Sequence, residues 1–200
     1  MSIFANVAAC QAIDGLTIPP NSDCLVVDIG TGNSGRFRFL PGSTAADASN
    51  QTVIAPTTNP SAGKWHRSDM SFDLKLPVGF GTTDGAVLYT VPTGFGSRMR
   101  ITRAFWEITT GFSGGVSSTI GLSSSSALYG TNGDLLGGAA GDLAAVLTTA
   151  LLFTGAIGTK LASLGTVVLV PGDTIKFNRI VSAFTAGAGF AHVCVDLLSL

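Results

Sequence analysis

The sequence predicts a mainly β protein, with a small N-terminal β module followed by an antiparallel β-sandwich of jelly-roll type. Three observations predict this class. Residues 35–69 hold three short apolar runs separated by Pro, Gly, Ser and Asn, which is typical of strands joined by turns. Residues 84–200 hold about six to eight further strand-like runs with at most one helix. The composition, with 26 Gly and 12% charged residues, is typical of a protein with many strands and loops.

The pattern divides the chain into three parts. We assign residues 1–70 to the small module and residues 84–200 to an oligomerising sandwich. Between them, residues 71–83 contain a cluster of Pro and Gly, and we expect a linker there.

Within the small module we expect one helix and several strands. Residues 2–13 have the spacing of a short amphipathic helix with Ser2 as its N-cap. The runs Phe37 to Leu40, Thr52 to Ala55 and Lys64 to His66 predict short strands.

The sandwich region contains three local signals. Met99 to Thr110 is the longest strand candidate, and its apolar residues change face part of the way along, so we expect a β-bulge or bend near Thr102–Arg103. Pro171-Gly172-Asp173 predicts a tight turn between two strands. Alternation around Ala191 to Leu197 predicts a half-buried strand.

The sequence contains few charged residues, and this limits the kinds of partner that the protein can bind. A net charge of −1 argues against nucleic acid, whose phosphates require a basic excess. Residues 104–172 carry only four charged residues and include the apolar run 143–153. A stretch with so few charges is expected to be buried between subunits, so we predict a homo-oligomer, with a cyclic trimer favoured. Leu151, Leu152 and Phe153 are the candidate interface residues.

Residues 143–159 form the one membrane-like run, but it is shorter than the ~20 apolar residues that a spanning helix needs and it contains Thr and Gly. We therefore expect no membrane partner, and the N-terminus has no pattern of a targeting segment.

The sequence contains no motif that predicts a catalytic or cofactor site. Three cysteines without a C-x-x-C motif predict reduced, buried thiols, with a Cys10–Cys24 bridge as the alternative. The histidines, His66 and His192, have no ligand spacing, so we expect no metal. Gly30-x-Gly32-x-x-Gly35 matches a dinucleotide fingerprint, but a Phe-rich run rather than a helix follows it. We expect no cofactor and no enzymatic activity.

Two groups of side chains remain as candidates for binding. Trp65 with Arg67 could form a stacking surface for a sugar or a base, or Trp65 could simply cap a small core, and Trp106 is a second candidate platform for a glycan. Arg98 and Arg100 could meet a neighbouring subunit, or could face solvent or form pairs within the chain. Glu107, the only Glu, is expected to pair with Arg100 or Arg103.

Residues 32–67 resemble the small N-terminal domain of tailed-bacteriophage fibre and tailspike proteins. The resemblance lies in a glycine loop, an aromatic strand, a Pro-Gly-Ser-Thr-Ala-Ala-Asp turn, a Thr-Val-Ile-x-Pro run and a closing Gly-Lys-Trp-x-Arg. The later Tyr-Thr-Val-Pro-x-Gly (from Tyr89) and Val-Pro-Gly-Asp (from Val170) loosely resemble the β-sandwiches of phage head-decoration and fibre-base proteins. The chain lacks the β-helix repeat that follows the module in tailspikes.

These resemblances imply a non-enzymatic virion protein, assembled in the host cytoplasm. The expected role is a capsid decoration or head-fibre subunit that self-assembles and docks on other virion proteins, such as the major capsid protein. A tail fibre or tail adaptor subunit is one alternative. A carbohydrate-binding module for host-surface glycan is the other.

Overall fold

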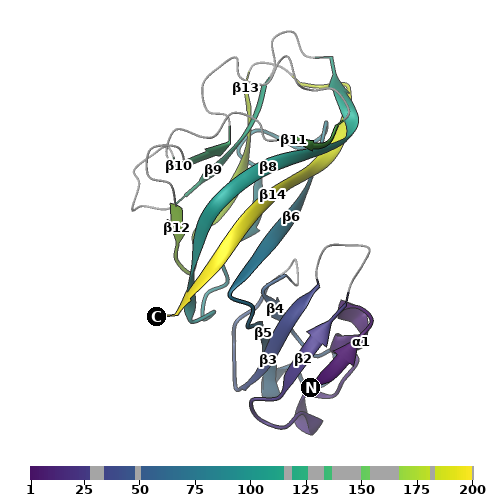
Figure 1. The fold of residues 1–200 in the computed structure, drawn as a ribbon, viewed down its shortest axis with the longest axis vertical. Helices are drawn as coiled ribbons and strands as arrows, with labels where there is room; N and C mark the ends of the chain where they lie inside the picture. Colours follow the sequence, from purple (N-terminus) through teal and green to yellow (C-terminus); the bar gives the residue numbers. More distant parts are fainter. Residues whose placement is uncertain are drawn as a thin grey trace.

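Two β units lie one above the other along the long axis of the molecule (Figure 1). The computed structural model describes residues 1–27, 34–47, 51–114, 119–125, 133–136, 150–153, 167–180 and 183–199. The small unit ends with strand β5 (Gly63–Arg67), and the large unit begins with β6 (Ser71–Gly79), so three residues join them. The protein is mainly β, as its sequence predicts.

The small unit is a five-stranded sheet with the strand order β1-β2-β3-β5-β4. β1 pairs in parallel with β2, and the other neighbours are antiparallel. Its remaining strands are β1 (Ser2–Phe4), β2 (Asp23–Val26), β3 (Gly35–Pro41) and β4 (Val53–Ile54). Gly35 begins a strand, so the helix that the dinucleotide fingerprint needs is absent at this position.

The expected helix over residues 2–13 is wrong in its first half. Residues 2–4 form β1, and α1 (Val7–Gln11) begins only after Asn6. The side chain of Asn6 caps α1 by accepting a hydrogen bond from the Ala9 N–H at 2.8 Å. Short 3₁₀ turns follow at η1 (Gly15–Thr17) and η2 (Pro60–Ala62). In the described part of the chain, no helix is long and apolar enough to cross a membrane.

The small unit has its own core, centred on Trp65. The Trp65 indole makes edge-to-face contacts with Phe39 and Phe4, at ring-centroid distances of 5.3 and 6.3 Å. Cys10 and Cys24 are free and fully buried in the same core. A hydrogen bond with the neighbouring Cys24, together with burial, raises the pKa of the Cys10 thiol far above its ordinary value, which keeps this thiol protonated.

The large unit is a jelly roll, which its strand pairing defines. Four antiparallel pairs, β6–β14, β7–β13, β8–β11 and β9–β10, make up a long folded ribbon. The pairs β14–β8 and β13–β9 roll this ribbon into two sheets, β11-β8-β14-β6 and β10-β9-β13-β7. The strands are β7 (Val87–Thr90), β8 (Ser97–Ser113), β9 (Thr119–Ser124), β10 (Gly133–Leu136), β11 (Ala150–Phe153), β12 (Val167–Leu169), β13 (Thr174–Ile180) and β14 (Ala186–Ser199). β12 also pairs with β8.

The core of the sandwich lies between these two sheets. β14 contributes Ala191, Val193 and Val195, which alternate with outward-facing residues as the sequence predicts. From β8, the indole of Trp106 packs edge-on against Phe177 of β13, with ring centroids 6.4 Å apart. The two sheets are therefore held by apolar contacts between their inner faces.

The predicted bulge lies on β8 at Thr102. Arg103 pairs with Cys194 and Ile101 pairs with Val195, so Thr102 is the extra residue on β8. Met99 and Ile101 are buried before the bulge, and Ala104 and Trp106 after it. The bulge keeps all four apolar side chains on the core face, which confirms the prediction.

The linker expected over residues 71–83 is wrong, because most of it is strand β6. This strand forms nine residue pairs with β14, from Ser71↔Asp196 to Gly79↔Ala188. Pro77, which suggested a break, lies on the edge of the sheet. A proline is tolerated there because its missing N–H would face away from the neighbouring strand.

The predicted turn at residues 170–173 joins β12 to β13. The Asp173 N–H donates to the Val170 carbonyl at 2.9 Å, and Gly172 adopts φ +94°. This arrangement, with Pro171 before a glycine of positive φ, is a type II turn.

We predict that Gly172→Ala destabilises the protein by about 1 kcal/mol, because an L-residue is strained at this positive φ while its Cβ meets no neighbour. The measurement is urea denaturation. Gly81→Ala is the matched control, since Gly81 also has open space around its Cβ position but has no positive φ. Equal stability of the two variants would contradict the strain argument.

Candidate functional site

The two units meet where the edge strands β6 and β7 leave one side of the sandwich open. Ala45 and Val53 belong to the small unit, yet both are fully buried in the sandwich core beside Tyr89 and Phe95. We call residues 43–47 together with 51–53 the plug segment. The plug segment supplies apolar surface that the sandwich would otherwise lack on this side.

A chain of hydrogen bonds fixes the plug segment to β7. One oxygen of the Asp47 carboxylate accepts from the Gln51 N–H, the Thr52 N–H and the Thr52 hydroxyl at 3.1, 2.7 and 2.7 Å. The Thr52 hydroxyl lies 2.8 Å from the Tyr89 hydroxyl. Because Thr52 already donates to Asp47, Tyr89 is the donor in this contact. Burial and the charge of Asp47 both raise the pKa of Tyr89, which keeps the donor proton in place.

Gln51 protects the edge of β6. Its side-chain amide donates to the Lys75 carbonyl at 3.2 Å and accepts from the Lys75 N–H at 3.1 Å. These are the backbone groups that an added strand would use. Gln51 is itself buried, so both ends of its amide depend on this contact.

Arg67 is enclosed at the junction rather than exposed. It donates to the Gln51 carbonyl at 2.9 Å, and its guanidinium group lies over the Phe72 ring at 4.2 Å. Its Nε lies 3.3 Å from Asp69. Burial lowers the pKa of Arg67, and Asp69 opposes this effect. Arg67 therefore links the last strand of the small unit to the first strand of the sandwich.

His66 makes a second link between the units. Its Nε2 lies 2.6 Å from the Ser43 hydroxyl, and its ring stacks on Phe95 with centroids 5.8 Å apart. Burial lowers the pKa of His66, so the ring is held in its neutral form at neutral pH.

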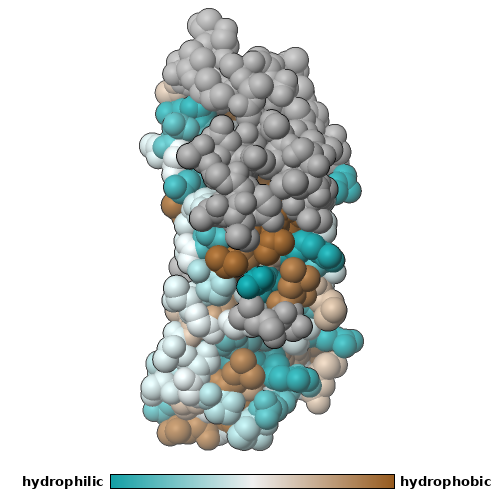
Figure 2. Space-filling model, turned by 90° about the vertical axis from the view of Figure 1, so that its left-hand side faces the viewer, coloured by the Kyte–Doolittle hydropathy of each residue, from teal (hydrophilic) through white to brown (hydrophobic). Residues whose placement is uncertain are grey.

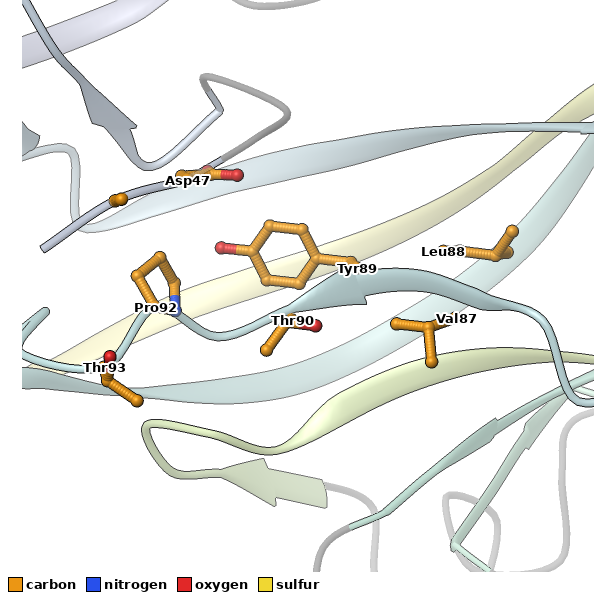
Figure 3. Close-up of a pocket in the computed structure, with 8 residues that line it drawn as sticks. Asp47, Val87, Leu88, Tyr89, Thr90, Pro92 and Thr93 are labelled. Carbon is orange, nitrogen blue, oxygen red and sulfur yellow. The ribbon is translucent and has the colours of Figure 1, made fainter.

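A pocket of about 360 Å³ opens beside this junction. Figure 3 shows Asp47 on one side and the strand carrying Tyr89 and Thr90 on the other. The lining residues are Ala46, Asp47, Val87, Leu88, Tyr89, Thr90, Pro92 and Thr93. Asp47 is the only one of these residues that is charged at neutral pH, so the pocket is apolar with one negative wall.

The outer face of the sheet containing β14 carries a charged cluster around His192. Its Nε2 lies 2.7 Å from Glu107, and its Nδ1 contacts Asp73. Lys75 also pairs with Glu107, at 2.9 Å, and Phe105 stacks on the imidazole with centroids 4.7 Å apart. Burial lowers the pKa of His192, but the two carboxylates more than offset it, so the net pKa is raised.

The structure does not leave Trp65 available for a sugar. The residue is 2% exposed in the core of the small unit, so the interpretation as a capping Trp is the one that the structure supports. Trp106 is fully buried as well. Arg67 is 7% exposed, and its role is within the chain. Stacking of a glycan on Trp65 with Arg67 is therefore incompatible with this packing.

The other predicted site residues do not lie together in the structure. Arg98 and Arg100 lie near the start of β8, and Arg100 pairs with Asp196 at 2.6 Å. Leu151, Leu152 and Phe153 form part of β11, far along β8 from these arginines. Their side chains, and residues 143–149 of the apolar run, lie outside the described residues.

The expected pairing of Glu107 with Arg100 or Arg103 is wrong. Glu107 pairs with Lys75 and His192, which belong to β6 and β14. Bonds from these two groups outweigh burial and lower the pKa of Glu107. The sequence spacing favoured an arginine on the same strand, but the neighbours across a sheet come from distant parts of the chain.

Sequence reasoning missed the plug segment altogether. Asp47, Gln51 and Thr52 stand in a polar stretch that resembles an ordinary loop. The one available signal was an Asx-type spacing, since Asp47 could cap nearby backbone N–H groups, but nothing in the sequence placed that loop against Tyr89.

Within the described residues, no group of three or more His, Cys, Asp or Glu side chains could hold a metal ion. No protein family, curated protein or solved structure matches this chain. The site is therefore characterised by its own geometry, as a junction that joins the two β units, with a mainly apolar pocket at its side.

We predict that Tyr89→Phe costs about 1 kcal/mol of stability, because one buried hydrogen bond is lost. Thr52→Val should cost about 1–3 kcal/mol, because it removes the bond from the Thr52 hydroxyl to Asp47 and leaves the buried Tyr89 hydroxyl without a partner. The double variant should therefore cost less than the sum of the two, by about 1 kcal/mol in urea denaturation. Strictly additive effects would show that the two hydroxyls do not interact.

We also predict a pH signature for His192. Because its folded-state pKa is raised, the charged ring contributes stability that is complete below the unfolded value of 6.5 and is lost as the pH rises through the folded pKa. The stability difference between the wild type and His192→Gln should thus shrink as the pH rises above 6.5 and through the raised pKa of His192, as measured by urea denaturation. A difference that stays constant would contradict the imidazolium assignment.

Proposed function

We propose that this protein is a non-enzymatic structural component of a tailed-phage virion, a capsid decoration or head-fibre protein that self-assembles and docks on the particle. The observation that carries the proposal is the built junction between the units. The strands of the region that resembles the small N-terminal domain of phage fibre and tailspike proteins lie in one sheet. The Pro-Gly-Ser-Thr-Ala-Ala-Asp turn of that region provides the first part of the plug segment, which completes the jelly roll. Such a junction suits a part that must hold a fixed orientation.

The fold class supports the proposal without deciding it. Jelly rolls occur in viral capsid proteins, and also in lectins and enzymes. The polar clusters support a structural role, because Arg67, His66, Gln51 and Lys75 are engaged in contacts that join the units or the strands. The surface in Figure 2 carries separate apolar patches between hydrophilic residues. Exposed large apolar side chains in the described part are Met1, Ile3, Leu16, Met70, Phe80 and Val87.

Self-association follows from the low charge of the sequence, and a cyclic trimer is the proposed form. A tail fibre or adaptor subunit would use the same junction, so the location in the particle distinguishes the two roles. The glycan-binding alternative loses its main candidate platform, since neither Trp65 nor Trp106 is exposed.

The test is to purify the phage particles that encode this chain and to locate it by mass spectrometry and cryo-electron microscopy. We expect the chain on the capsid exterior, in a copy number set by capsid symmetry. Density on the tail would favour the adaptor role. Absence of the chain from intact particles would overturn the proposal.

Sedimentation velocity of the isolated protein tests self-association separately. We expect a discrete oligomer at micromolar concentration, because the protein has too few charged residues to keep the apolar surfaces of separate molecules apart. A single monomeric species across this range would contradict the oligomer.

A further inference from the structure

We propose that the pocket beside the junction binds an extended peptide segment of another polypeptide, which adds a strand to the free edge of β7 and brings a basic side chain to Asp47. The inference names the class of docking partner and so rests on the proposed function. It is carried by the pairing of β7, by the charge of the pocket lining and by a contrast between the two edge strands.

The backbone of β7 has a free side. β7 ends its sheet, with β13 as its only partner among the described strands. The backbone of Val91 bonds toward β13, donating to the Asp173 carbonyl and accepting from the Gly172 N–H, both at 2.8 Å. Because backbone groups alternate along a strand, the N–H and C=O of Thr90 point the other way. Thr90 is exposed and lines the pocket.

β6, the edge strand of the facing sheet, is protected where β7 is not. On β6, Gln51 occupies both backbone groups of Lys75, and Pro77 has no N–H to offer. Both devices prevent the addition of a strand. Among the described contacts, no side chain occupies the backbone groups of Thr90 on β7, and Pro92, whose missing N–H would face the same way, limits the free edge to Thr90 and the residues before it. The chain therefore blocks one edge of the same open side and leaves the other free.

The shape and charge of the pocket suit an extended basic peptide. The plug segment forms the wall opposite β7, and the bonds from Gln51 and Thr52 to Asp47 hold that wall in place before any partner arrives. Val87, which is 53% exposed, provides apolar surface at the pocket. Asp47 is on the wall and no cationic side chain of the described residues lines the pocket, so the lining favours a partner with a Lys or Arg beside small apolar residues.

The probe that tests this is the peptide acetyl-Lys-Val-Thr-Val-Lys-amide, titrated into ¹⁵N-labelled full-length protein and followed by NMR. We expect chemical-shift changes centred on Thr90 and Thr93, and slower hydrogen exchange at the Thr90 amide. The charge-reversed peptide acetyl-Glu-Val-Thr-Val-Glu-amide should bind more weakly. Shifts elsewhere on the protein, or equal binding of the two peptides, would overturn the proposal.

The matched variant is Thr90→Pro, which removes the pocket-facing N–H without costing a bond to β13. It should weaken binding roughly tenfold, the effect of about one hydrogen bond. The control is Thr90→Val, which keeps the N–H and should bind as the wild type does. If Thr90→Pro does not fold, a peptide N-methylated at its central Thr tests the same backbone bonds from the other side. Unchanged affinity in these experiments would overturn strand addition.

Two further outcomes separate strand addition by a partner from self-association and from the proposed role in the virion. If the Thr90 amide is already protected in the peptide-free protein, and dilution removes the protection, a second copy occupies the edge and the proposal is wrong. The titration uses the isolated protein, so failure to bind the peptide overturns strand addition and leaves the location in the virion untouched. Conversely, absence of the chain from particles would overturn the proposed function even where the peptide binds.

Discussion

The insertion of the plug segment into the open side of the jelly roll is the contact on which the rest of the structure depends. Ala45 and Val53 extend the sandwich core, while Gln51 and Thr52 satisfy backbone and side-chain groups at its two edges. Burying these polar groups is unfavourable unless every one finds its partner, so the junction tolerates only one relative placement of the units. The two sheets of the sandwich and the small sheet therefore behave as one body, although each has a separate apolar core.

This arrangement explains how charged residues are used in a chain that has few of them. Lys75, Glu107 and His192 lie where strands from distant parts of the sequence meet, and Arg67 lies where the two units meet. Their bonds are directional, so each fixes the position of one residue against its partner. Apolar contacts are less specific, because a strand shifted by two residues still presents the same face to the core. The charged residues thus fix register, and the apolar residues provide most of the burial.

Local pattern was enough for features that depend on a few neighbouring residues. The face change between Ile101 and Ala104 located the bulge, and Pro171-Gly172 located the turn. The pattern failed where the outcome depended on tertiary context. Pro77 indicated a linker because its position at a sheet edge is invisible in the sequence. Trp65 beside Arg67 resembled an exposed binding surface, and only the fold shows that Phe39 and Phe72 enclose them. Asp47, Gln51 and Thr52 gave no sign of the strands they contact.

The pairing of β14 has a consequence for the order of folding. β14 lies between β6 and β8, and Ser71 contacts Asp196 across 125 positions of sequence. Until β14 is in place, β6 has no strand beside it in its sheet. The side of the sandwich that the plug segment covers is then incomplete. The small sheet pairs residues much closer in sequence and can form first. A ribosome-bound chain would then carry an ordered small unit together with a sandwich whose apolar faces stay exposed until β14 is synthesised. Pairing of such distant strands is slow, and the exposed surface makes this stage prone to aggregation.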